Sequence, residues 1–199
     1  MTGRRGGWWG VAFVVALFVG SAMVSLPTAA QGGRQIQAFY AAHATVILIQ
    51  QVLGIVALAF FLAFAVALGA RRQRWLLIGT VALAIAELAT NIPAVILAVA
   101  NLEPEGAHAL TVIEDLADGA LFVSIAVFSV AATMGQVAWV RAAGFVVAAV
   151  SLLRVVMTAV GVHALDVLAP TGFLALVLIL SIRLLMGRGM PRSSRLSQP

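Results

Sequence analysis

Six apolar stretches, each long enough to cross a lipid bilayer, constrain this 199-residue chain more than any other feature. A hydrocarbon core of about 30 Å needs roughly 20 residues of helix. Hydrophobic residues make up 63% of the chain and charged residues 10%, too few charges to cover a water-facing surface. We therefore predict an all-α, polytopic membrane protein, a bundle of six transmembrane helices in contact with lipid. The stretches cover residues 8–29, 45–70, 75–100, 110–135, 142–163 and 171–186.

The basic residues gather at one end of these stretches. All twelve are arginines, and ten of them lie at that end, with no acidic residue among them. Trp8, Trp9, Trp75 and Trp139 lie at the same boundary, as in an interfacial aromatic belt. The positive-inside rule then predicts cytoplasmic N- and C-termini in a multi-pass protein of the bacterial cytoplasmic (inner) membrane. It also explains the net charge of +5 without a nucleic-acid partner.

The first stretch has a competing interpretation. Arg4 and Arg5, an apolar run and "PTAAQ" resemble a signal peptide that is cleaved after Ala30. The apolar run is longer than the usual 7–15 residues of such a peptide, so we favour an uncleaved first helix; cleavage would leave five helices. Residues 1–187 are expected to form the transmembrane domain. The polar residues 188–199 are expected to form a disordered cytoplasmic tail.

Two opposite charges lie at matching depth inside the predicted spans. Glu87 lies thirteen residues beyond Arg74, and Arg154 lies thirteen residues beyond Arg141. At 1.5 Å per residue, both lie about 20 Å from the arginine-rich boundary. An arginine inside the bilayer needs a partner or a wet cavity, and its side chain leans toward the helix N-terminus, away from the nearer water. The sequence therefore predicts an intramembrane ion pair between Glu87 and Arg154, either a structural clamp or a protonatable site.

Further polar residues surround that level and predict a pocket that opens to the outside. Thr90 and Asn91 follow Glu87 on one helix face, and Gln50, Gln51 and Asp118 lie near the outer ends of their stretches. The arginine-rich halves of the stretches are nearly free of polar residues, which argues against a continuous aqueous channel. Taken singly, each residue also fits an interhelical hydrogen bond.

Histidines and carboxylates at the outer ends are weak candidates for a metal site. His43, His108, His163 and Asp166 all map there, and such side chains bind zinc or copper. No ligand motif such as HExxH is present, and the histidines come from separate segments, so the metal stays unknown, as does any cofactor. There is no cysteine, no GxSxG and no P-loop, and no catalytic residue is assigned. The sequence therefore favours a protein that is not an enzyme, without deciding the question.

One segment resembles a known group of proteins. "FYAAHATVILIQQVLGIVALAFFLAFAVAL", from Phe39 to Leu68, is similar to a segment of a family of six-helix integral membrane proteins of actinobacteria. The resemblance rests on Phe39, Tyr40, His43 and Gln51 and on the arginine-rich turn that follows. The family carries no assigned activity, so no functional residue is transferred from it.

Three functions remain open from the sequence. The leading interpretation is a small membrane protein whose outward-facing polar pocket binds a small ligand, or which acts as an accessory subunit beside a membrane protein partner or in a homo-oligomer. The second is a proton-coupled transporter or sensor that uses Glu87 paired with Arg154. The third is a membrane metalloenzyme with a histidine and carboxylate site on its outer face.

Overall fold

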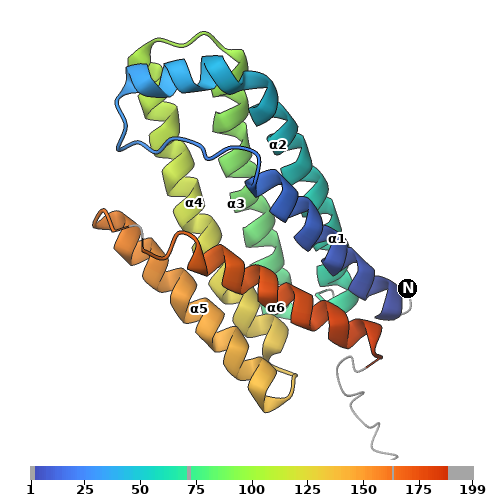
Figure 1. Ribbon diagram of the computed structural model, residues 1–199. Helices are drawn as coiled ribbons and strands as arrows, with labels where there is room; N and C mark the ends of the chain where they lie inside the picture. Colours follow the sequence, from blue (N-terminus) through green and yellow to red (C-terminus); the bar gives the residue numbers. More distant parts are fainter. Residues whose placement is uncertain (1–2, 71–72, 163, 188–199) are drawn as a thin grey trace, which may run out of the picture.

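The computed structural model describes residues 3–70, 73–162 and 164–187, and within them the chain forms six helices and no strand (Figure 1). Five of these, α2 to α6, are long and apolar enough to cross a membrane. The architecture is thus an all-helical bundle with the features of a multi-pass membrane protein. The helices are α1 (Gly3–Ser21), α2 (Gly33–Leu68), α3 (Arg74–Val99), α4 (Pro104–Thr133), α5 (Ala138–Ala159) and α6 (Leu168–Leu185).

The outer surface of the bundle is apolar. Val52 and Ile85 are both 63% exposed, and Val146 is 61% exposed, on three different helices. A water-soluble monomer rarely exposes apolar side chains in continuous patches of this kind. An apolar surface of this kind is compatible with contact to lipid tails and agrees with the predicted class of protein.

Several helix limits differ from the predicted spans, and α2 begins at Gly33, twelve residues before residue 45. The first helix ends at Ser21, not near residue 29, and residues 22–32 form no helix. Pro27 lacks an amide hydrogen and disfavours helical geometry at Leu26, which opposes an uninterrupted helix to residue 29. By contrast, α4 begins at Pro104, well before residue 110, because proline suits the first helical position. The segment 22–32 is therefore not part of a membrane-spanning helix; it runs from the end of α1 past α4 to the start of α2.

The bundle has two distinct ends. We call the one that carries the α3–α4 connection the α3–α4 end, and the opposite one, with the α2–α3 connection, the α2–α3 end. Figure 1 shows that the first turns of α2 lie across the α3–α4 end before the helix bends into the bundle. There Ile36 and Tyr40 pack with Ala94, Leu97 and Ala107 in a small buried cluster.

A cluster of four phenylalanines forms the centre of the main core. Phe61 contacts Phe128, with ring centroids 4.9 Å apart, and Phe13, at 5.3 Å, while Phe173 lies 6.0 Å from Phe128. The four rings come from α2, α4, α1 and α6, so the cluster joins helices that are far apart in the sequence. This aromatic core lies between the α2–α3 end and the polar groups described next.

Candidate functional site

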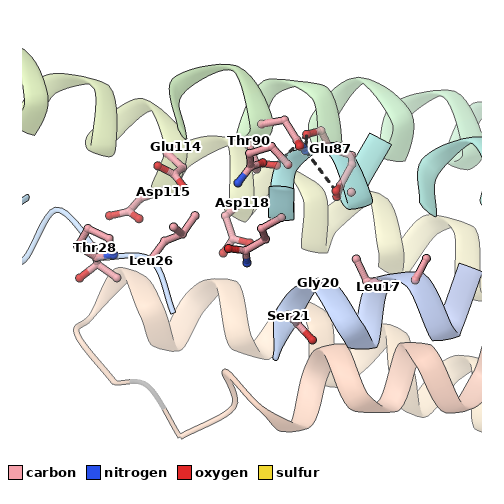
Figure 2. A pocket seen from close by; sticks show the side chains of 16 residues that line it. Leu17, Gly20, Ser21, Leu26, Thr28, Glu87, Thr90, Glu114, Asp115 and Asp118 are labelled. Carbon is pink, nitrogen blue, oxygen red and sulfur yellow. Dashed lines mark hydrogen bonds between the residues drawn. The ribbon is translucent and has the colours of Figure 1, made fainter. Parts of the chain in front are cut away.

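A polar cavity of about 300 Å³ lies between α1, α2, α3 and α4, near the α3–α4 end. Figure 2 shows Glu87 and Thr90 of α3 and the carboxylates of α4 on one side, and Leu17, Gly20 and Ser21 of α1 on the other. The segment 22–32 borders it through Leu26, Pro27 and Thr28. All five residues assigned to a polar pocket from the sequence line this cavity: Gln50, Gln51, Thr90, Asn91 and Asp118.

A second hollow, which we call the aromatic cavity, continues the first. It has a volume of about 260 Å³ and is lined by Phe13, Phe122 and Phe173, among other apolar side chains. The two cavities share five lining residues: Leu17, Ser21, Gly54, Glu87 and Asp118. The residues that belong to the aromatic cavity alone lie mostly one turn nearer the α2–α3 end. The protein therefore holds one elongated hollow with a polar part and an apolar part.

Arg154 lies at the junction of α4, α5 and the turn before α6. Its Nη1 donates a 2.7 Å hydrogen bond to Asp118, and its Nε donates to Asp166 at 3.1 Å. The guanidinium also stacks over Phe122, with its carbon 3.9 Å from the ring centroid. Its side chain is only 12% exposed. Two carboxylates and an aromatic face together stabilise a cation that would be costly alone in a membrane.

The predicted partner of Arg154 is therefore corrected. We expected Glu87, yet among the described residues no hydrogen bond or ion pair joins Glu87 to Arg154. The two side chains do line the same aromatic cavity, as their matching depth implied. The reason lies in the packing, because α5 packs against α4 and α6, and α4 supplies a nearer carboxylate, Asp118.

Glu87 instead belongs to a small amide and carboxylate group on α3. Asn91 donates from Nδ2 to the Glu87 main-chain oxygen at 2.7 Å and to the Glu87 carboxylate at 3.3 Å, and Thr90 donates to the same main-chain oxygen. Pro93 follows two residues later within the helix and removes one backbone donor. Asn91 is only 7% exposed, and its Oδ1 has no hydrogen-bond partner among the described residues.

Two more carboxylates of α4 line the polar cavity, and neither has a cationic partner among the described residues. Glu114, which is buried, accepts a 3.1 Å hydrogen bond from the hydroxyl of Tyr40. Asp115 accepts a 2.9 Å bond from the main-chain amide of Ala29, which holds the segment 22–32 against α4. Neither Tyr40 nor this segment was predicted from the sequence to belong to the site. The one tyrosine of the chain, placed just before a predicted span, was the available signal.

We expect Tyr40→Phe to lower the free energy of unfolding by about 1–3 kcal/mol, since it leaves a buried carboxylate without its donor. The same loss should not follow Asp115→Asn, because Asp115 is exposed and its amide variant can still accept the Ala29 bond. Thermal or denaturant unfolding of the purified protein measures both. Equal stability of Tyr40→Phe and the wild type would contradict a structural role for this hydrogen bond.

The histidines do not form a metal centre within the described part of the chain. No group of three or more histidine, aspartate or glutamate side chains there is close enough to hold a metal ion. His43 stacks on Phe39, with centroids 4.5 Å apart, and bonds to its main-chain oxygen. Asp166, a metal candidate from the sequence, binds Arg154. His163 and the predicted tail 188–199 lie outside the described residues.

Comparison with known proteins gives no relative for this arrangement. No protein-family model matches the chain, and no curated protein or solved structure is detectably similar to it.

Proposed function

We propose that this chain is a ligand-binding protein of a bacterial cytoplasmic membrane, with its polar cavity open to the external side. In this proposal all six helices cross or enter the bilayer, both termini are cytoplasmic, and the chain belongs with the actinobacterial six-helix proteins that its Phe39–Leu68 segment resembles. The arginine and tryptophan distribution supports this orientation.

The observation that carries the proposal is the polar cavity itself. Its volume of about 300 Å³ is at the lower end of the range of small-molecule sites, and it continues into the aromatic cavity. The buried oxygens of Asn91 and Gln50 have no hydrogen-bond partner among the described residues. Buried acceptors without partners are costly, and a bound ligand would satisfy them.

Binding is preferred over the two alternatives for specific reasons. Asp118 and Asp166 engage Arg154, which removes the ion pair on which a transporter based on Glu87 and Arg154 was built. For a metalloenzyme, the candidate ligands His43 and Asp166 have different partners, Phe39 and Arg154, and no group of three or more possible ligands lies together among the described residues.

The absence of cysteine makes the chain a ready background for testing access to the cavity. We expect Ser21→Cys and Thr90→Cys, on opposite walls of the cavity, to react with a membrane-impermeant thiol reagent added to the outside of intact cells. Ser181→Cys is the matched control, because Ser181 is fully buried near the α2–α3 end and should stay unreactive. Mass spectrometry of the purified variants measures the labelled fraction.

Two outcomes would overturn the proposal. If Thr90→Cys reacts no faster than Ser181→Cys, the cavity is closed to water. If both cavity cysteines react only in inverted vesicles, the cavity opens to the cytoplasm and the proposed orientation is wrong.

A further inference from the structure

The balance of charge around the elongated hollow indicates the sign of its ligand. Four carboxylates line the polar cavity: Glu87, Glu114, Asp115 and Asp118. Among the described lining residues of both cavities, Arg154 is the one basic side chain. It is already engaged by Asp118 and Asp166. Within the described part of the chain, the other three carboxylates have only neutral hydrogen-bond donors as partners, and an anionic ligand would be repelled.

Two oxygen atoms converge on the place where the cavities meet. A Cβ placed on Gly54, which lines both cavities, would lie 3.2 Å from Asn91 Oδ1 and 3.5 Å from Glu87 Oε1. One of these oxygens belongs to a carboxylate and the other to a buried amide without a partner at this atom. Both are acceptors, and an ammonium group carries three donors and no acceptor.

The apolar part of the hollow indicates the rest of the ligand. Phe13 and Phe173 of the aromatic cavity belong to the central aromatic cluster, and Leu58, Leu83 and Ile125 are among its other apolar lining residues. A metal ion would leave this surface without a partner. A ligand with a hydrocarbon body fills it and removes apolar area from water.

We propose that the elongated hollow binds an amphiphilic organic amine, with its ammonium group at Glu87 and Asn91 and its hydrocarbon body in the aromatic cavity. This inference rests on the proposed function and specifies its ligand class. Glu87 and Asn91 accept hydrogen bonds from the ammonium group, and Gly54, which has no side chain, places no atom between these oxygens and the hollow.

The test uses three probes that share one skeleton: 4-phenylbutylamine, 4-phenylbutanol and 4-phenylbutyrate. The full chain is placed in zwitterionic lipid nanodiscs, and binding is measured by titration calorimetry, with empty nanodiscs subtracted for partition into lipid. We expect the amine to bind at least about tenfold more tightly than the alcohol, since hydrogen bonds to a charged group are stronger than neutral ones. The carboxylate probe should not bind.

Two variants locate the site. Glu87→Gln should lower the affinity for the amine by about tenfold and leave the affinity for the alcohol unchanged. Gly54→Ala should lower the affinity for both probes, because its added methyl group occupies the place where the two cavities meet. The matched controls are Glu105→Gln, an exposed carboxylate of α4, and Gly172→Ala, where an added Cβ meets Val147 at an ordinary 3.7 Å. Neither control residue lines the polar or the aromatic cavity, and neither variant should change the affinity for any probe.

The failures can be told apart. Equal binding of amine and alcohol, both lost in Gly54→Ala, would overturn the amine inference and leave the proposed binding function standing. Binding of the amine that is unchanged in both Glu87→Gln and Gly54→Ala would overturn this site. Absence of binding by every probe would overturn the inference as well, whereas the proposed function is judged independently by access to Ser21→Cys and Thr90→Cys.

Discussion

Arg154→Leu is expected to lower the free energy of unfolding by about 3 kcal/mol, the lower end of the usual 3–5 kcal/mol for breaking a buried ion pair. The loss arises because Asp118 and Asp166 keep their negative charges without the cation that stabilises them. We choose the lower end because their side chains are 37% and 34% exposed, so solvent screens part of the repulsion. Denaturant titration of the protein in detergent measures the change.

Matched variants identify the partner in this prediction. Arg34→Leu removes an exposed arginine and should change stability by less than about 0.5 kcal/mol. Adding Asp118→Asn to Arg154→Leu should recover part of the loss, because one unpaired charge is removed. Adding Glu87→Gln should recover none. Recovery with Glu87→Gln and not with Asp118→Asn would contradict the arrangement described above.

Gly10→Leu is expected to release α1 from its site against α2 and α6. Even a Cβ at this position would overlap Ser181 Oγ and lie 2.8 Å from the ring of Phe64, which is fully buried. Overpacking of this kind costs about 1–3 kcal/mol, and the larger leucine should reach or exceed the upper limit. Because α1 forms a wall of the polar cavity, this variant should also lose the binding of 4-phenylbutylamine.

The control for this effect lies on the same helix. A Cβ on Gly20 would meet Leu53 at 3.7 Å, an ordinary contact, so Gly20→Ala should keep or slightly raise the unfolding free energy. The unfolding free energy of Gly10→Ala, which adds a smaller side chain, should lie between those of Gly10→Leu and Gly20→Ala. Its loss should shrink when Ser181→Ala is added, since one of the overlapping atoms disappears. Wild-type stability of Gly10→Leu would show that α1 does not dock as described.

Much of the architecture was predictable because it depends on which segments of the chain are apolar enough to prefer lipid to water. Apolar runs of about 20 residues identify spans by length and composition alone, and five of the six stretches correspond to helices that could cross a membrane. The first stretch was assigned too long, since apolar content continues past Ser21 while the helix does not. Apolar composition does not reveal that the chain leaves the helix after Ser21. It also does not reveal that the segment 22–32, which contains Pro27, binds Asp115 of α4.

The residues of the cavity were predictable for a similar reason. Polar side chains within apolar helices are expensive against lipid, so they turn toward one another. Gln50, Gln51, Thr90, Asn91 and Asp118 were grouped from depth alone, and they line one cavity. Gly54 carried no such signal, because a glycine in an apolar helix is equally compatible with packing, a bend or a binding site.

The height of each charge along its helix was predictable from the sequence, since a helical rise of 1.5 Å per residue converts position into height. It placed Arg154 and Glu87 at one level and implied that a buried cation needs an acidic partner or a wet cavity. Only the tertiary structure decided which partner, because height says nothing about which helices are neighbours. The packing of α5 against α4 and α6 brings Asp118 and Asp166 to Arg154. Glu87 instead lines the hollow and accepts a hydrogen bond from Asn91.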